Sequence, residues 1–270
     1  MSNDQATQET PRIRVGCAGL PPRMPRERYF RDLSFLESDV MHRAPPRRAA
    51  VRAWRDAAPD EAGFSLLAWQ ALTHAAGKKG YAFKGRDLGP AELAETGGLR
   101  DTPTIRSGVD AMREAAELLR AEAVVFRTPA SFTPSAKNRD AMKRFFGDIA
   151  PAGAFGGAWR VWEPEGLWGA EEAVRFSAEL GVVLACDPLA RDPLEEQLPV
   201  LATELPRDAA YFRIRGLGSA DQQLDGGELE ALAEFIEDFE RVWVAFGNVG
   251  KFSDARRFAR ALGAAPDEQG

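Results

Sequence analysis

The chain has 270 residues, 44% hydrophobic and 28% charged, which is the composition of an ordinary globular protein and a length that suits a single α/β barrel. Its net charge of −6 disfavours non-specific nucleic-acid binding, so we do not expect a nucleic-acid partner. We expect a cytoplasmic protein without a membrane partner, because no apolar run approaches membrane-spanning length and residues 1–10 contain no apolar signal core. Its two cysteines, Cys17 and Cys186, each fall in an apolar run, which excludes a disulfide framework.

The first third of the chain predicts three strands separated by helices. Residues 1–11 are polar and predict a disordered lead, followed by one domain over residues 12–265. Apolar runs between glycine and proline residues mark the strands. The expected elements are a strand over 13–19, a helix near 26–36, a weak second strand over 39–44, a helix carrying Val51 and Trp54, and a third strand over 64–70.

Residues 71–104 interrupt this alternation. The segment contains six glycines and few apolar residues, so it predicts a long, mobile loop after the third strand, lying over the barrel mouth. Loops of this length in compact domains are typically lids or disordered segments. A lid and a decoration without a role both remain open.

The remaining chain returns to regular alternation. Ile105, Val109, Met112, Ala116 and Leu119 are spaced by four, three, four and three residues, which is the stripe of an amphipathic helix. An acidic connection over 189–208 shows little helical periodicity and predicts irregular structure. Further strands are expected over 123–129, 158–164, 182–188, 209–216 and 241–248, with helices over 135–149 and 169–180, a helix carrying Leu229 to Phe239, and a last helix carrying Phe252 to Leu262.

Eight nearly continuous apolar strands alternating with helices indicate a parallel sheet covered on its faces. Eight is the number that closes a (β/α)8 barrel, so we predict a somewhat irregular TIM-type barrel with a long loop after strand three. An open, doubly wound sheet is the second interpretation. It is disfavoured because no Gly-x-Gly-x-x-Gly motif follows the first strand.

Polar residues at the expected carboxyl ends of the strands are the candidates for a functional site, because TIM-type barrels carry their sites there. They are Glu37 or Asp39 beside the second strand, Gln70 after the third, Arg127 on the fourth, Glu163 on the fifth, Asp187 on the sixth, Arg213 and Arg215 on the seventh, and Asn248 on the eighth.

Ionised groups inside apolar strands need partners, so we expect two buried ion pairs, Arg127 with Glu163 and Asp187 with Arg213. This pattern is consistent with two interpretations. Either the ion pairs only fill the barrel interior, or the arginines bind an anionic ligand. Asp187 and Glu163 are the candidate catalytic residues, although pairing with arginine lowers a carboxylate pKa and suits a general acid poorly. The candidate ligand-binding residues are Arg127, Arg213, Arg215, Asn248, Glu37 and His74.

The sequence predicts no metal site and leaves the cofactor open. His42 and His74 are the two histidines, too few for a zinc cluster of the barrel hydrolases. No nucleophile elbow, phosphate-binding P-loop or His-Glu-x-x-His motif occurs. His74, at the entry to the 71–104 segment, is either an acid–base group or a solvated loop residue.

Several strand segments together resemble the YecE-like family, the domain of unknown function numbered 72. The segments are Ile13-Arg-Val-Gly-Cys-Ala-Gly19, Val124-Val-Phe-Arg-Thr-Pro-Ala-Ser-Phe132, Trp159-Arg-Val-Trp-Glu-Pro164, Val183-Leu-Ala-Cys-Asp187, Tyr211-Phe-Arg-Ile-Arg-Gly216 and Val244-Ala-Phe-Gly-Asn248. The resemblance covers residues 13–263 and implies a TIM-barrel-type fold without an established general activity. It carries over Asp187, Arg213 and Asn248.

The chain departs from the family pattern at several positions. Arg127 stands where the family typically has glutamine, Val161-x-Glu163 replaces its Glu-x-Arg pair, and Arg215 replaces a histidine. The lysine expected near the end of the third strand is missing around Trp69. These exchanges put any chemistry shared with the family in doubt.

Three functions follow from these patterns. The first is a barrel that binds a small anionic or phosphorylated ligand at its mouth, with hydrolase-type activity. The second is a catalytically degenerate ligand-binding or regulatory barrel. The third is a nucleic-acid phosphodiesterase, which the acidic balance and the scarcity of histidine weaken. The sequence leaves open whether the protein is an enzyme and what its oligomeric state is.

Overall fold

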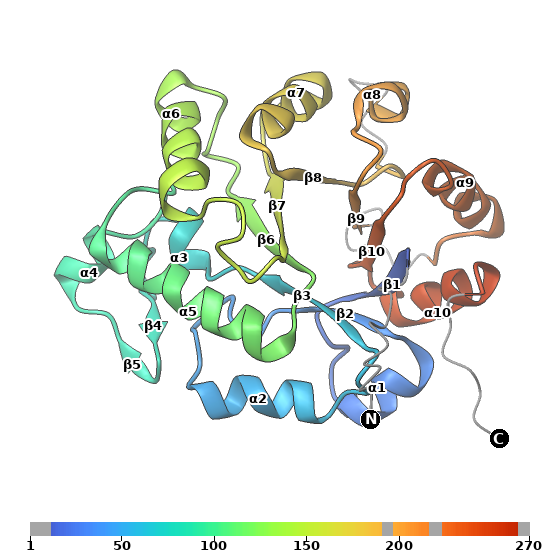
Figure 1. Cartoon of the computed structure of the whole chain (residues 1–270), viewed down its shortest axis with the longest axis horizontal. Helices are drawn as coiled ribbons and strands as arrows, with labels where there is room; N and C mark the ends of the chain where they lie inside the picture. Colours follow the sequence, from blue (N-terminus) through green and yellow to red (C-terminus); the bar gives the residue numbers. More distant parts are fainter. Residues whose placement is uncertain (1–11, 191–196, 216–222, 264–270) are drawn as a thin grey trace, which may run out of the picture.

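Eight parallel strands form a closed barrel in the computed structural model, which describes residues 12–190, 197–215 and 223–263 (Figure 1). Around the barrel the strands follow the order β1-β10-β9-β8-β7-β6-β3-β2. Their bounds are β1 Ile13–Ala18, β2 Phe35–Ser38, β3 Gly63–Leu67, β6 Ala123–Thr128, β7 Trp159–Pro164, β8 Val183–Cys186, β9 Ala210–Ile214 and β10 Val242–Phe246. The predicted (β/α)8 barrel is confirmed, while the lead predicted for residues 1–11 lies outside the described residues.

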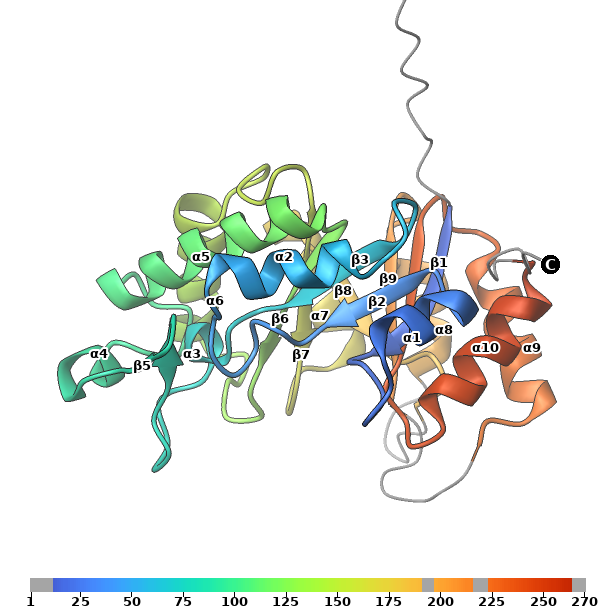
Figure 2. The same ribbon diagram turned by 90° about the horizontal axis from the view of Figure 1, so that it is seen from below.

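Helices surround the barrel on its outside (Figure 2). They are α1 Arg26–Asp32, α2 Arg48–Asp56, α3 Gln70–Thr73, α4 Pro90–Ala94, α5 Pro103–Leu119, α6 Ala136–Arg144 with a π-helical end Phe145–Ile149, α7 Ala170–Leu180, α8 Gln197–Glu204, α9 Gly226–Ile236 and α10 Lys251–Ala261. The connection predicted to be irregular thus contains α8. Within the described parts of the chain, no helix combines the length and apolar character needed to cross a membrane.

The second strand lies earlier than the sequence predicted. The expected strand over 39–44 is wrong, because β2 occupies Phe35–Ser38. The expected helix near 26–36 is confirmed, although α1 ends earlier, at Asp32. The hydroxyl of Tyr29 helps to fix β2, since it donates to the carbonyl of Phe35 at 2.6 Å and accepts from the amide of Cys17 in β1 at 2.8 Å. As a consequence Glu37 lies within a barrel strand.

The segment 71–104 is not the structureless loop that its glycines predicted. It contains the end of α3, a short hairpin of β4 Ala82–Phe83 and β5 Arg86–Asp87, and α4. Phe83 of the hairpin packs against Trp69, which precedes α3, and the two ring centres lie 5.1 Å apart. The carboxylate of Glu95 accepts from both the amide and the hydroxyl of Thr104 and so fastens the segment to the start of α5.

The barrel separates two layers of buried side chains. Strand residues that point outward, such as Phe126 and Phe212, pack on helix aromatic residues. Strand residues that point inward form a second cluster that includes Val125, Val161 and Tyr211. Alternation along each strand therefore places every second residue in the barrel interior.

An ion pair closes the amino-terminal end of this interior. Arg14 of β1 donates to Glu122, which precedes β6, at 2.5 Å, and the side chains are 7% and 14% exposed. The indole of Trp243 donates to the other oxygen of Glu122 at 2.9 Å. The opposite, carboxyl-terminal end is the mouth of the barrel, where TIM-type barrels carry their sites.

Removing the carboxylate of this plug is expected to destabilise the barrel. Glu122→Ala leaves the buried Arg14 guanidinium and the Trp243 indole without their acceptor, so we predict a loss of about 3–5 kcal/mol in the free energy of unfolding. Chemical denaturation measures the change. Asp101→Ala, which breaks the exposed pair with Arg106, is the control and is expected to leave the denaturation midpoint nearly unchanged. Equal effects of the two substitutions would contradict a structural role for the plug.

Candidate functional site

Glu163 is the centre of a cluster of charged residues at the carboxyl-terminal mouth. It is the fifth residue of β7, points into the barrel and is only 1% exposed. Its carboxylate accepts from Arg127 Nε at 2.8 Å, from Arg215 Nη2 at 2.5 Å and from Arg213 Nη1 at 3.3 Å. The predicted pair of Arg127 and Glu163 is confirmed, and it arises because the two residues are register partners on β6 and β7.

A second buried carboxylate lies beneath this cluster. Glu37 accepts from Arg213 Nε at 3.1 Å and from the hydroxyl of Tyr211 at 2.8 Å. The same tyrosine oxygen lies 2.7 Å from Ser65 Oγ, on the opposite side of the interior. Arg213 therefore bridges two carboxylates and is held from below by a hydrogen-bonded chain across the barrel.

The arginines together have a larger effect on the pKa of Glu163 than burial has. Burial raises the pKa of this carboxyl, but the attraction of Arg213, Arg127 and Arg215 outweighs the burial and lowers it to about 2. Burial lowers the pKa of Arg213, and the two carboxylates reverse the effect and raise it above its ordinary value. Both groups are thus charged at neutral pH.

The cluster presents partly exposed guanidinium groups toward the mouth. Three guanidinium groups are balanced by the buried carboxylates of Glu37 and Glu163 and by that of Glu165, which lies 3.5 Å from Arg127 Nε. The Arg127 side chain is 20% exposed and that of Arg215 47%. Among the described residues Arg127 contacts carboxylates only through Nε, which leaves its two Nη groups for a ligand. Partly exposed guanidinium donors of this kind suit a carboxylate or a phosphate.

The predicted pair of Asp187 and Arg213 is wrong. Strand β8 ends at Cys186, and Asp187 instead accepts backbone amides, from Arg215 at 2.7 Å and from Leu189 at 3.0 Å. These bonds fix the turn after the strand. Burial raises the pKa of Asp187 against the lowering effect of the two amides.

His42 and His74 lie near each other and near Arg127 in the fold, although they belong to different predicted segments. His42 Nδ1 lies 2.9 Å from the carbonyl oxygen of Ala68, and His74 Nδ1 lies 2.8 Å from Thr73 Oγ1. Burial, followed by the charges of His42 and Arg127, lowers the pKa of His74 to about 4. Burial also lowers the pKa of His42. The fold alone revealed His42 as a mouth residue, because its sequence neighbourhood has no motif.

Asn248 lies in the turn between β10 and α10, and Lys251 lies at the mouth. Asn248 is 6% exposed and donates to Asp254 of α10 at 2.7 Å, so it makes no contact with the Glu163 cluster. Lys251 Nζ donates to the carbonyl oxygens of Ala18 and Gly19 at 2.8 and 2.9 Å, and burial lowers its pKa. Sequence reasoning missed Lys251, whose single signal is its place just after the last strand.

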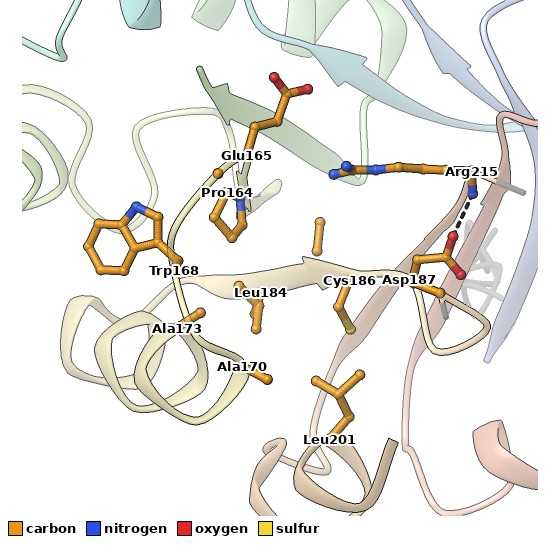
Figure 3. A pocket seen from close by; sticks show the side chains of 13 residues that line it. Pro164, Glu165, Trp168, Ala170, Ala173, Leu184, Cys186, Asp187, Leu201 and Arg215 are labelled. Carbon is orange, nitrogen blue, oxygen red and sulfur yellow. Dashed lines mark hydrogen bonds between the residues drawn. The ribbon is translucent and has the colours of Figure 1, made fainter. Parts of the chain in front are cut away.

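A pocket of about 320 Å³ adjoins the cluster (Figure 3). It opens between the ends of β7 and β8 and the helices α7 and α8. Arg215 and Glu165 belong both to its lining and to the ion-pair network, since Glu165 lies 3.5 Å from Arg127 Nε. The lining residues are Pro164, Glu165, Gly166, Trp168, Ala170, Ala173, Leu184, Ala185, Cys186, Asp187, Ala190, Leu201 and Arg215.

The described part of the chain contains no group of three or more histidine, cysteine, aspartate or glutamate side chains arranged to hold a metal ion.

Neutralising Glu163 is expected to make stability depend less on pH. Its folded-state pKa of about 2 lies below the ordinary 4.5, so its contribution is present above pH 4.5 and is lost as the pH falls toward 2. We predict that Glu163→Gln lowers the free energy of unfolding by about 3 kcal/mol at pH 7 and that the difference from wild type shrinks between pH 5 and 2. Urea denaturation at several pH values measures it.

Glu165→Gln is the matched control, because Glu165 lies two residues away and is 34% exposed. It is expected to change the free energy of unfolding by less than about 0.5 kcal/mol at each pH. A Glu163→Gln deficit that stays constant from pH 7 to pH 2 would show that the arginines do not hold this carboxylate ionised.

Solved structures of known proteins share this architecture at low sequence identity. A DUF72 family protein from Enterococcus faecalis V583 superposes with a TM-score of 0.65 and 15% identity, covering 94% of this chain and 97% of that one. A DUF72 family protein from Thermotoga maritima MSB8 gives 0.61 and 17%, covering 93% and 99%. An AP endonuclease of family 2 from Brucella melitensis gives 0.53 and 12%, covering 93% and 98%.

These likenesses establish a common fold. The comparison with curated proteins finds no match to this chain. A family model does match nearly the whole chain, over residues 17–269, and it is described as a protein of unknown function, DUF72. The chain belongs to the DUF72 family.

Proposed function

We propose that this DUF72 barrel binds a small anionic molecule, with a carboxylate or phosphate group, at its carboxyl-terminal mouth. The observation that carries the proposal is the Glu163 cluster, in which three arginines face two buried carboxylates and two of the arginines reach solvent. A buried carboxylate holding several guanidinium groups fixes their donors before a ligand arrives. Such preorganisation reduces the entropy that binding costs.

The three arginines have different roles in this proposal. Arg213 is 14% exposed and locked between Glu37 and Glu163, so it supports the site from below. Arg127 and Arg215 have the accessible donors and contact the ligand. A guanidinium fork fits two oxygens of a carboxylate or phosphate at once, which distinguishes these groups from a single-atom anion such as chloride.

Two versions of the function share this site. In the first, a hydrolase-type reaction takes place, and Asp187 exchanges the proton because its raised pKa suits that role better than the pKa of about 2 at Glu163. In the second, the ligand is bound without turnover. Glu163 is ionised at neutral pH and positions the arginines, although the sequence predicted it as a catalytic residue. This favours the second version, in which the ligand is bound without turnover.

A nucleic-acid phosphodiesterase has less support. The likeness to the endonuclease of Brucella melitensis extends to the fold alone, and the chain has a net charge of −6. The few arginines at the mouth suit a small anion better than a polyanionic strand, which needs a long basic surface.

Arg127→Gln tests the proposal. Inorganic phosphate or acetate, added at constant ionic strength, is expected to raise the melting temperature of the wild type, because a ligand that binds the folded state stabilises it by about 2.7 kcal/mol at one hundred times its Kd. The substitution removes the Nη groups of Arg127, which donate no hydrogen bond to another described residue, and is expected to abolish most of this shift. Differential scanning fluorimetry measures it.

Arg106→Gln is the matched control, because Arg106 lies on α5, outside the Glu163 cluster, and forms an exposed pair with Asp101. It should keep the full anion-dependent shift. A wild type that neither anion stabilises, or an Arg127→Gln protein that responds as strongly as Arg106→Gln, would overturn the proposed function. Comparing Asp187→Asn with the wild type on simple phosphate esters then separates turnover from binding alone.

A further inference from the structure

We infer, on the basis of the proposed function, that the pocket beside the cluster receives the carbon body of the anionic ligand. The ligand is then a small organic anion, with one charged head at Arg127 and Arg215 and a compact alkyl chain or single ring behind it. An inorganic ion would fill only the head position.

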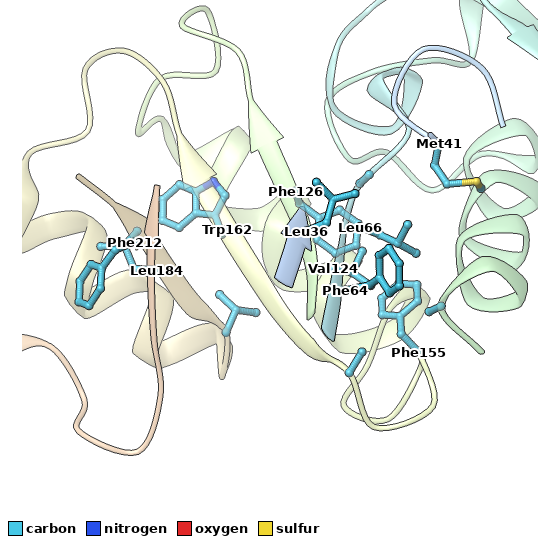
Figure 4. Close-up of a cluster of buried hydrophobic side chains, with 14 of the residues drawn as sticks. Leu36, Met41, Phe64, Leu66, Val124, Phe126, Phe155, Trp162, Leu184 and Phe212 are labelled. Atoms are coloured by element: carbon cyan, nitrogen blue, oxygen red, sulfur yellow. The ribbon is translucent and has the colours of Figure 1, made fainter. Parts of the chain in front are cut away.

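The pocket lies in the layer between the barrel wall and the outer helices. Leu184 and Trp162 point outward from neighbouring strands into this layer, which is closely packed farther along the barrel (Figure 4). Near the mouth the layer is left open, because α7 presents the small residues Ala170 and Ala173 toward Leu184. The small side chains of Ala170 and Ala173 on α7 therefore leave the space that forms the pocket.

The size of the pocket and the small apolar side chains in it fit a small carbon skeleton, while polar atoms make up much of the accessible lining. A volume of about 320 Å³ lies at the lower end of the range for ligand pockets, roughly 300–1,000 Å³. A water molecule takes about 30 Å³ of liquid, so the pocket has room for roughly ten groups of that size. Ten of the thirteen lining residues have no charged or hydroxyl side chain, while the three charged ones are Glu165, Asp187 and Arg215.

Arg215 connects the pocket to the charged head position. Its side chain extends from the end of β9 across the opening toward Pro164 and Glu165, with Asp187 at its base (Figure 3). Its backbone amide is held by Asp187 at 2.7 Å and its Nη2 by Glu163 at 2.5 Å. One small molecule thus contacts the guanidinium with its head and the pocket with its body.

The carboxylates at the opening restrict the class of ligand further. Glu165 and Asp187 both line the pocket, so a second anionic group on the ligand body would meet like charge in a poorly solvated space. The site therefore selects a molecule that is charged at one end. A hydroxyl or amino group beside the head has acceptors available at the same two carboxylates.

A pair of matched probes tests this inference. Isothermal titration calorimetry compares inorganic phosphate with phenyl phosphate, and acetate with hexanoate, on the full chain. For at least one pair we expect the organic member to bind about ten- to hundredfold more tightly, since burial of a ring or an alkyl chain adds to the same head contact.

Ala170→Leu places a larger side chain in the pocket and is expected to remove this preference while phosphate or acetate still binds. Ala190→Leu, at an exposed position of the lining, is a second variant that does the same with little effect on folding. Ala178→Leu is the control, because Ala178 lies on the same helix, is exposed and does not line this pocket; it should keep the preference.

The outcomes separate this inference from the proposed function. Equal affinity for both members of each pair overturns the inference and leaves anion binding intact. A preference that survives both pocket-filling substitutions also overturns it, because the carbon body then lies elsewhere. Failure of all four probes to bind the wild type removes the proposed function, and the inference with it.

Discussion

The mouth of this barrel depends on one buried carboxylate, that of Glu163. An ionised carboxyl that is 1% exposed is costly unless it is fully compensated, and here the compensation comes from Arg127 on β6, Arg213 on β9 and Arg215 just after β9. The closed barrel brings these strands to either side of β7 and β8, which allows the arginines to meet. The arginines in turn need the carboxylate, because without it like charges would face one another across the mouth.

The proposed anion binding rests on the same arrangement. Arg213 is occupied by two carboxylates, and the hydrogen-bonded chain through Tyr211 to Ser65 ties its position to the far wall of the interior. The nearby imidazole of His74, with a pKa of about 4, is neutral at pH 7 and leaves the electrostatics to the arginines. In the proposed function, Arg127 and Arg215 bind the anionic head and the adjoining pocket receives the rest of the ligand.

Much of the fold was predictable because parallel barrels have a regular pattern. Seven of the eight strands were located by apolar runs that are buried on both faces. The exception, β2, is a four-residue strand with Glu37 and Ser38 in it, and such a polar segment has no strand signal of its own. Its place is set by pairing with β1 and β3 and by the hydrogen bond from Tyr29, which are contacts that its own four residues do not reveal.

Contacts within the site were predictable only between residues that the strand register places side by side on adjacent strands. Arg127 and Glu163 occupy equivalent places on adjacent strands, so their pairing followed from their positions. Asp187 would have met Arg213 by the same logic if β8 had continued, but the strand ends one residue earlier and the carboxylate binds backbone amides instead. The approach of His42 to His74 depends on loop conformations, which neither periodicity nor motif spacing encodes.

A crystal structure grown in selenate tests the central claim most directly, because selenate mimics phosphate and scatters anomalously. The account predicts an anomalous peak at the mouth, within hydrogen-bond distance of the Nη groups of Arg127 and Arg215, with Glu163 still holding both arginines. An empty mouth in a crystal with well-ordered selenate elsewhere on the protein, or arginines turned away from Glu163, would contradict it.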